Sequence, residues 1–254
     1  MGDLLTKISI VIPILNSHEA VARQVKHFAR MSLPDDIEFI FVDDGSNPPL
    51  NIADYPLKNL TIHATNDKRP WTQGLARNAG AKIAEGEYLF MTDIDHILSH
   101  EAIDAVYAFQ GEKMIFPRYI AVLSPKGTLR QNLATLVEYG FDPARYQRRN
   151  RKYPALYASF HGNTFAMKRD VFWKLGGYKS RNCLYGFHAL PKKGEDCYFN
   201  TQWKHYAREN GIETAVGPAI FVFPVGRFNA TGDMNPKGIF HGLSHEPVPQ
   251  PMME

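Results

Sequence analysis

The sequence contains few cysteines and no long apolar run, and both shortages restrict what the protein can be. Only Cys183 and Cys197 occur among its 254 residues, and two thiols outside any CxxC pair cannot form a zinc site by themselves. Nothing in their spacing supports a disulfide, so a reducing compartment suits the chain. The longest apolar stretches, such as residues 8–15 and 38–42, have the length of strands, whereas a membrane-spanning helix needs about 20 apolar residues.

A secretory leader and a strong excess of one charge are also missing. The N-terminus lacks the basic segment and apolar run that form a signal peptide. The formal net charge is only +3, which is too small to favour a nucleic-acid partner. We therefore expect a soluble, cytoplasmic protein with no transmembrane segment, which leaves room for peripheral contact with a membrane surface. The length suits one large domain better than two small ones.

The first half of the sequence alternates between strand and helix patterns. Residues 7–15 and 37–42 are β-branched runs typical of buried parallel strands, and shorter strands are expected at 60–64 and 87–91. Helices are expected between them, at 17–31, 72–84 and 99–110, with Ser17, Thr72 and Ser99 as N-caps. This order predicts an α/β fold whose sheet is covered by helices. The second half is less regular, and we expect strands at 113–123, 164–168 and 212–223 and helices at 169–175 and 194–209.

Two of the expected strands end in acidic turns. Asp43 and Asp44 follow the second strand, and Asp93 and Asp95 follow the fourth, at the sheet edge where ligands bind in such folds. A carboxylate at the first turn can accept hydrogen bonds from a base and a ribose, although Asp-Gly is also ordinary turn chemistry. The second pair can hold Mg²⁺ or Mn²⁺, whose remaining positions would go to diphosphate oxygens.

A third acidic pair, Glu195 and Asp196, stands near the expected start of the helix at 194–209. A carboxylate there can act as a general base if it is well placed. The alternative is a purely electrostatic role, because acidic residues are common at helix N-termini.

Four segments in order resemble the motifs of glycosyltransferase family 2, the inverting enzymes with a GT-A fold. They read ISIVIPILN, FIFVDDGS, GLARNAGAKIAEGEYLFMTDID, and GNTFAMKRDVFWKLGGY followed by GED. The resemblance covers about residues 7–210. It implies one GT-A-like catalytic domain over residues 1–225, with a Rossmann-type mixed sheet flanked by helices. The nucleotide-binding half would reach about residue 110 and the acceptor-binding half would occupy residues 111–225.

The same resemblance implies an activity and a set of partners. The enzyme would transfer a sugar from a nucleotide-sugar donor, with UDP favoured over GDP, to a hydroxyl of a glycan or glycoconjugate, with the help of Mn²⁺ or Mg²⁺. On the nucleotide side, Asp44 with its neighbour Asp43 would bind uracil and ribose. Pro13 and Leu15 would line the nucleoside pocket, and Arg77 would lie near the base or the phosphates.

On the reaction side, the resemblance assigns the remaining acidic residues. Asp93 would approach the ribose, and Asp95 would be the principal metal ligand. Asp196 would be the general base with Glu195 as its acidic neighbour. We expect His96 to be a surface or strand-end histidine rather than a ligand.

The C-terminal segment, residues 226–254, is rich in Gly, Asn, Pro and His and is expected to be a loop and tail that could close over the active site. Within it, the resemblance to GT-A enzymes makes His241 a candidate third metal ligand, with an exposed tail histidine as the alternative. Among the aromatic residues, Tyr185 and Phe187 are candidates for acceptor binding, whereas Trp173 is expected to fill the core.

Three other classes of protein remain as alternatives. A non-catalytic nucleotide-sugar-binding or scaffold protein would not need three acidic sites. A sugar nucleotidyltransferase usually has a glycine-rich basic loop after the first strand, and Asn16-Ser17-His18 is not such a loop. A dinucleotide-dependent dehydrogenase is disfavoured because no GxGxxG follows any expected strand.

Overall fold

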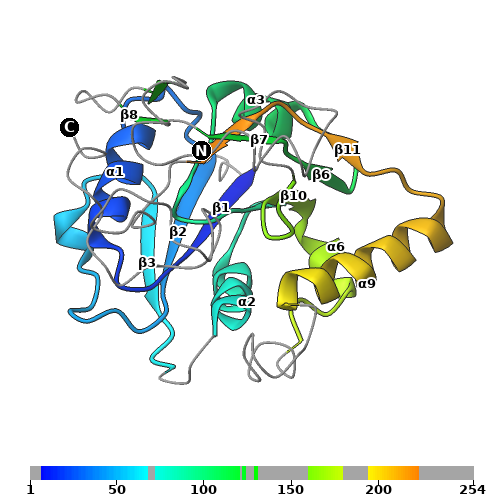
Figure 1. The fold of residues 1–254 in the computed structure, drawn as a ribbon, viewed down its shortest axis with the longest axis horizontal. Helices are drawn as coiled ribbons and strands as arrows, with labels where there is room; N and C mark the ends of the chain where they lie inside the picture. Colours follow the sequence, from blue (N-terminus) through cyan, green and yellow to red (C-terminus); the bar gives the residue numbers. More distant parts are fainter. Residues whose placement is uncertain are drawn as a thin grey trace, which may run out of the picture.

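The computed structural model describes residues 7–67, 72–120, 122–123, 129–130, 160–179 and 194–222. Their main feature is a seven-stranded sheet in the order β11-β6-β10-β4-β1-β2-β3 (Figure 1). Strand β10 runs antiparallel to both of its neighbours, and the other pairings are parallel. The mixed α/β fold expected from the sequence is therefore confirmed. The strands are β1 (Ile8–Ile14), β2 (Ile37–Asp43), β3 (Leu60–Ala64), β4 (Tyr88–Met91), β6 (Lys113–Ile115), β10 (Phe165–Lys168) and β11 (Ala215–Val216).

Two further sheets are small. One contains three strands in the order β5-β12-β7 and the other pairs β8 with β9. Their strands are β5 (His96–Ile97), β7 (Arg118–Ile120), β8 (Val122–Leu123), β9 (Leu129–Arg130) and β12 (Ile220–Val222). The three-stranded sheet is the one that matters for the site, because it brings residues of β5 and β7 together.

Helices cover both faces of the large sheet, which explains why its central strands are apolar throughout. All seven residues of β1 are buried. Its even-numbered isoleucines share one core with helices α1 and α3, whereas Val11 shares another core with helices α2, α6 and α9. The helices are α1 (His18–Phe28), α2 (Gln73–Ile83), α3 (His100–Ala108), α6 (Arg169–Lys174) and α9 (Glu195–Asn210), with a short 3₁₀ turn, η1 (Ile52–Asp54).

The strand register places the acidic turns at one edge of the sheet. Ile14 at the end of β1 pairs with Asp43 at the end of β2, and Val11 pairs with Met91 at the end of β4. Because the three strands are parallel, the chain leaves each of them on the same side. The turns that follow β2 and β4 therefore open at the same edge.

The expectation of two long continuous strands is wrong, because each of these segments is divided between two sheets. The segment 113–123 leaves the large sheet after β6, and the segment 212–223 leaves it after β11. Pro117 lies at the first break and has no N–H to continue a ladder. Gly217 lies at the second, where a Cβ would stand 2.5 Å from a ring carbon of Phe116. The two segments pair again as β7 and β12 in the three-stranded sheet.

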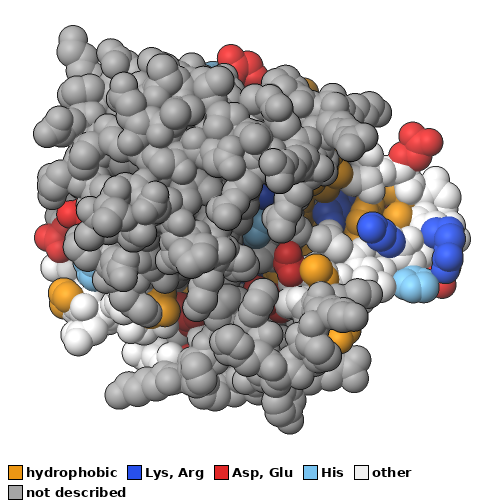
Figure 2. Space-filling view, in the orientation of Figure 1, with side chains coloured by type: hydrophobic (Ala, Val, Ile, Leu, Met, Phe, Trp, Pro, Cys, Tyr) orange, Lys and Arg blue, Asp and Glu red, His pale blue; other side chains and the backbone are white. Residues whose placement is uncertain are grey.

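Helix boundaries agree with expectation more closely than helix caps do. The Ser99 hydroxyl accepts a hydrogen bond from a backbone N–H of the first turn of α3, so that cap is confirmed. Ser17 and Thr72 occupy the N-cap positions of α1 and α2 but make no side-chain cap bond. Trp173 is 40% exposed, so its expected place in the core is wrong. The last turns of α9 extend past the sheet and carry exposed basic side chains (Figure 2).

Candidate active site

The turn after β2 contains two carboxylates with different surroundings. Both oxygens of Asp43 accept backbone N–H groups of its own turn, from Ser46 and Leu50, each at 2.8 Å. Asp44 instead accepts the hydroxyls of Thr72 at 2.8 Å and Thr65 at 3.1 Å. Asp43 thus holds the turn, which is the plain turn role that its sequence context allowed. Asp44 is held by side chains from two other segments.

Burial raises the pKa of the Asp44 carboxyl, and the hydrogen bonds from Thr72 and Thr65 act in the opposite direction. The Thr72 hydroxyl is thereby used on Asp44 rather than as a cap for α2. The end of β1 is tied to the same turn, because the Asn16 N–H donates to Ser46 Oγ at 2.9 Å. Pro13 is buried beside Val42 and Leu15 is partly exposed. All four candidate residues Pro13, Leu15, Asp43 and Asp44 lie at this one edge.

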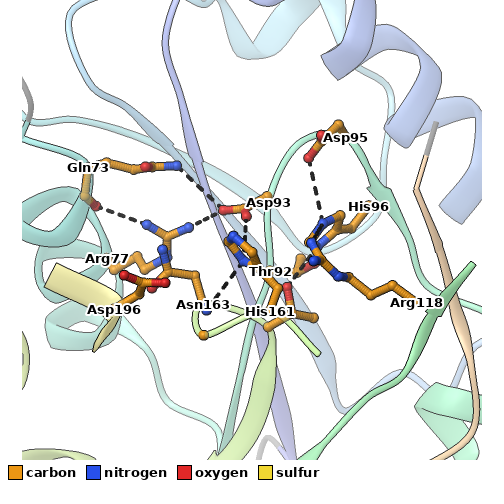
Figure 3. A network of polar contacts seen from close by, with 12 residues as sticks. Gln73, Arg77, Thr92, Asp93, Asp95, His96, Arg118, His161, Asn163 and Asp196 are labelled. Carbon is orange, nitrogen blue, oxygen red and sulfur yellow. Dashed lines mark hydrogen bonds and ion pairs between the residues drawn. The ribbon is translucent and has the colours of Figure 1, made fainter. Parts of the chain in front are cut away.

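Asp93, two residues beyond β4, is the most strongly paired carboxylate of the described residues. Its Oδ1 accepts the guanidinium of Arg77, a residue of α2 that is fully buried, and its Oδ2 lies 3.2 Å from His161 Nδ1 (Figure 3). Burial alone would raise the pKa of Asp93, but Arg77 and His161 hold it well below the usual range. For Arg77 the directions are reversed: burial alone would lower its pKa, but the Asp93 carboxylate raises it above the usual value. Arg77 and Asp93 therefore form an ion pair within the candidate site.

Asp95 immediately precedes β5, and His96 is the first residue of that strand. One ligand atom from each of Asp93, Asp95 and His96 lies within 4.8 Å of the others, a spacing compatible with a single cation. The donor set of two carboxylates and one imidazole fits Mn²⁺ or Mg²⁺ through its oxygens. His96 is nearly fully buried, so the expectation of a strand-end position is right and that of a surface position is wrong.

Both ring nitrogens of His96 are engaged by other side chains. Nδ1 lies 2.7 Å from Thr164 Oγ1, and Nε2 lies 3.1 Å from Arg118 Nη1. Because a guanidinium can only donate, Nε2 accepts and the ring proton resides on Nδ1. Asp95 Oδ1 lies 3.8 Å from the same Nε2. Through these contacts the His96 ring supports the turn that carries Asp95.

Helix α1 fixes the backbone on either side of Asp95. The fully buried Gln24 carboxamide donates from Nε2 to the carbonyl oxygens of Ile94 at 3.0 Å and His96 at 2.5 Å. One turn later, His27 Nε2 lies 2.8 Å from the Leu98 carbonyl oxygen. Contacts of this kind orient metal ligands from outside their first coordination sphere.

Asp196 and Glu195 begin α9, as the sequence predicted. Asp196 is partly exposed, whereas Glu195 is buried. The Asp196 side chain lies against Gly162, where a Cβ would stand 2.7 Å from Asp196 Oδ2. Figure 3 shows Asp196 beside Arg77 and close to His161. A larger residue at position 162 would therefore force the Asp196 side chain to move.

The turn of residues 161–164 contains two residues that sequence reasoning missed. His161 bonds Asp93 as described, and burial lowers the pKa of its ring to about 4 although Asp93 opposes the change. Asn163 Oδ1 accepts the hydroxyl of the buried Tyr178 at 2.8 Å, so Asn163 ties this turn to the core. The available signal was position: His161 immediately precedes the GNTFAMKRD segment.

Several residues predicted from the sequence lie outside the described residues. These are Tyr185 and Phe187, His241, and the whole segment 226–254. Across the part of the chain that the structure describes, no helix is long and apolar enough to cross a membrane.

Sequence comparison relates the chain to enzymes that act on sugars. The family model described as glycosyl transferase family 2 matches residues 9–176. A poly(ribitol-phosphate) β-glucosyltransferase of Bacillus spizizenii is 34% identical over 113 residues, which are 42% of this chain and 17% of that protein. A poly(ribitol-phosphate) β-N-acetylglucosaminyltransferase of Staphylococcus aureus is 28% identical over 112 residues, 42% of this chain and 34% of that protein. These matches therefore cover about a third or less of each relative.

Structural comparison finds the same fold in solved structures, one of which is a mannosyltransferase. A mannosyltransferase of Pyrobaculum calidifontis, solved with GDP-mannose and Mn²⁺, superposes with a TM-score of 0.53 at 16% identity, covering 87% of this chain and 58% of that one. Residues 1–349 of the Staphylococcus aureus protein TarS superpose with a TM-score of 0.51 at 16% identity, covering 86% of this chain and 60% of that one. At this identity the likeness concerns the fold, and it agrees with the expected GT-A architecture.

Proposed function

Because the chain belongs to glycosyl transferase family 2, we propose that it is an inverting glycosyltransferase that uses a nucleoside-diphosphate sugar. The favoured donor is a UDP-sugar, and the acceptor is a hydroxyl of a glycan or glycoconjugate. One observation carries the proposal. The candidate base Asp196 lies against the same turn whose His161 bonds Asp93, so acceptor-side and donor-side carboxylates meet at one sheet edge.

The donor half of the site is assigned to the turns after β1, β2 and β4. Asp44 accepts hydrogen bonds from the base and ribose, and Pro13 and Leu15 line the nucleoside pocket. Asp43 shapes this turn, because both of its oxygens are used within it. Arg77 acts through its ion pair with Asp93, which keeps that carboxylate charged next to the ribose.

Asp95 and Asp93 are the residues that would hold a divalent cation. Bound Mn²⁺ or Mg²⁺ would supply positive charge to the diphosphate as it leaves. His96 supports the acidic turn, since Thr164 and Arg118 occupy its two nitrogens. His241 as an additional ligand, on a segment that closes over the donor, remains part of the proposal and lies outside the described residues.

The reaction proposed is a single displacement at the anomeric carbon. Asp196 accepts the proton of the acceptor hydroxyl while the hydroxyl oxygen forms a bond to the anomeric carbon on the face opposite the diphosphate. The bond between the anomeric carbon and the phosphate oxygen breaks, and its electron pair leaves with the nucleoside diphosphate. Glu195 is assigned a supporting role because its side chain is buried, whereas Asp196 is partly exposed.

An acceptor with phosphodiester-linked polyols is the specific candidate, because two of the relatives are named for poly(ribitol-phosphate). Tyr185 and Phe187 remain candidates for contacts with the acceptor. A cytoplasmic enzyme that meets its acceptor at a membrane surface is consistent with this class of substrate.

Calorimetry of UDP with and without Mn²⁺ tests the donor site. The wild-type protein should bind UDP more tightly with the ion than after chelation. Asp95→Asn should reduce the metal-dependent part of the affinity by about tenfold or more, since a charged hydrogen-bonding partner contributes about 1.5–3 kcal/mol. Asp104→Asn, an exposed carboxylate of α3, is the matched control and should bind as the wild type does. Equal UDP affinity with and without metal would contradict the assignment of the cation.

Product analysis separates the remaining alternatives. Release of UDP from UDP-glucose or UDP-N-acetylglucosamine in the presence of a poly(ribitol-phosphate) acceptor supports transfer. Binding without any turnover supports a scaffold, and release of pyrophosphate from UTP and a sugar phosphate supports a nucleotidyltransferase. GDP-mannose is included because the mannosyltransferase of the same fold was solved in complex with it.

A further inference from the structure

His161 has one ring nitrogen committed to Asp93 and the other available to a ligand. Nδ1 lies 3.2 Å from Asp93 Oδ2 and 3.4 Å from the backbone nitrogen of Asn163, so the ring is held through this nitrogen. Among the described residues none bonds to Nε2. The His161 side chain is 22% exposed, so the ring is not sealed in the core.

The backbone that carries His161 is held on several sides. The Thr164 N–H donates to the His161 carbonyl oxygen at 3.2 Å, and Thr164 Oγ1 lies 2.7 Å from His96 Nδ1. Asn200 of α9 donates from Nδ2 to the Gly162 carbonyl oxygen at 3.4 Å. The His161 ring also lies edge-on to the His96 ring, with centroids 5.6 Å apart. A side chain supported in this way can present a fixed atom to a substrate.

The ring stands between the two carboxylates to which the proposed reaction gives opposite roles. On one side His161 touches Asp93, and on the other the residue that follows it, Gly162, packs against Asp196 (Figure 3). In a single displacement the transferred sugar must lie between the leaving diphosphate and the base. The groups that this sugar offers to its surroundings are hydroxyls, and a hydroxyl can bond an imidazole nitrogen as either donor or acceptor.

We propose that His161 Nε2 binds a hydroxyl of the sugar being transferred and so helps to select the donor sugar. This inference rests on the proposed function. It adds a contact to the sugar itself, whereas the residues assigned above contact the nucleotide, the metal or the acceptor proton. Its measurable consequence is that His161 contributes to binding of the nucleotide sugar and not to binding of the nucleotide alone.

Two substitutions separate the two nitrogens of the ring. The amide nitrogen of Asn can replace Nδ1, so His161→Asn keeps the contact with Asp93 and removes the group at Nε2. The longer Gln side chain reaches the Nε2 position, so His161→Gln removes the contact with Asp93 and keeps a polar group toward the sugar. His205→Asn, at an exposed position of α9, is the control, and thermal unfolding of all three variants verifies that they fold.

The experiment measures dissociation constants for UDP, UDP-glucose and UDP-N-acetylglucosamine in the presence of Mn²⁺. His161→Asn should bind UDP as the wild type does and the preferred UDP-sugar about 3- to 10-fold more weakly, the value of one hydrogen bond. His161→Gln should weaken UDP and UDP-sugar by the same factor, so that the ratio of their affinities is preserved.

Three results would overturn the inference. The first is an unchanged affinity for every UDP-sugar in His161→Asn. The second is a loss of UDP affinity in His161→Asn equal to its loss of UDP-sugar affinity, which would limit the ring to holding Asp93. The third is an effect confined to the KM of the acceptor. Failure of the wild-type protein to bind UDP with Mn²⁺ would instead contradict the proposed function, and the inference would fall with it.

Discussion

A buried lysine next to the candidate site predicts how the stability of the protein depends on pH. Lys113 of β6 is almost fully buried, and its Nζ donates to Asn200 Oδ1 at 3.0 Å. The rings of Phe165 and Trp203 lie 4.6 Å and 5.4 Å from the same nitrogen. Burial, with repulsion from Lys204 as a smaller cause, lowers the pKa of Lys113 from 10.5 to about 7. We predict that Lys113→Met abolishes a rise in stability between pH 7 and pH 9.

The sign follows from where the proton is bound. Between pH 7 and 10.5 the unfolded chain keeps the Lys113 proton while the folded protein has released it, so the free energy of unfolding increases with pH. A pKa lower by about 3.5 corresponds to at most about 5 kcal/mol. Over the interval from pH 7 to pH 9 the increase is about 2 kcal/mol. Below pH 7 both states hold the proton, and the cost of burying the ammonium is present in full.

Equilibrium unfolding in urea at pH 7 and pH 9 measures the effect as a difference between proteins. The wild-type protein should gain about 2 kcal/mol relative to Lys113→Met over this interval, because contributions from all other groups are common to both. Lys174→Met, which removes an exposed lysine that also lies over an aromatic ring, should change with pH as the wild type does. Parallel stabilities of wild type and Lys113→Met would refute the reasoning and show that the aromatic rings and Asn200 keep the ammonium charged.

Three further substitutions test the supports of the site. Gln24→Met should lower the free energy of unfolding by about 2–4 kcal/mol, because it removes the side-chain donor from the two backbone carbonyls that flank Asp95. It should also weaken Mn²⁺-dependent UDP binding about 10- to 100-fold, and an unchanged metal dependence would show that Gln24 contributes only to stability. Asp44→Asn should reduce UDP affinity by about tenfold or more through loss of a charged acceptor, whereas unchanged calorimetric affinity would return Asp44 to a turn role. Gly162→Ala should lower kcat by up to about 100-fold and leave UDP affinity unchanged, because the Cβ of the alanine must displace the Asp196 side chain. Full turnover in this variant would show that the position of Asp196 is not critical.

The parallel half of the fold could be predicted from the sequence because its signals are local and mutually consistent. A strand covered on both faces must be apolar throughout, so β1 and β2 stand out as uninterrupted runs, and the predicted third strand agrees residue for residue with β3. The acidic turns could be placed together because parallel strands deliver their carboxyl ends to one edge. The start of α9 was likewise predicted to within one residue, with Glu195 and Asp196 in its first turn.

The errors in the predicted strands and helix caps occur where a contact with a residue distant in the sequence overrides the local sequence pattern. Residues 113–123 and 212–223 have the composition of single strands, and only the arrangement of the sheets divides each at Pro117 or Gly217. Thr72 stands at a helix start, where its hydroxyl usually caps, but a buried carboxylate 28 residues earlier takes that hydroxyl instead. Because Asp44 is far from Thr72 in the sequence, the capping preference of residues near the helix start gives no sign of this contact.

The sequence by itself determined the fold class, the acidic turns and the family, since each of these depends on short segments read in order. Only the tertiary structure decided which side chains surround those turns. His161 contacts Asp93 across 68 residues, Gln24 holds the backbone beside Asp95 across about 70, and Lys113 finds Asn200 across 87. Each of these polar groups would cost free energy if buried alone. Their partners come from other strands and helices, and no local pattern contains that pairing.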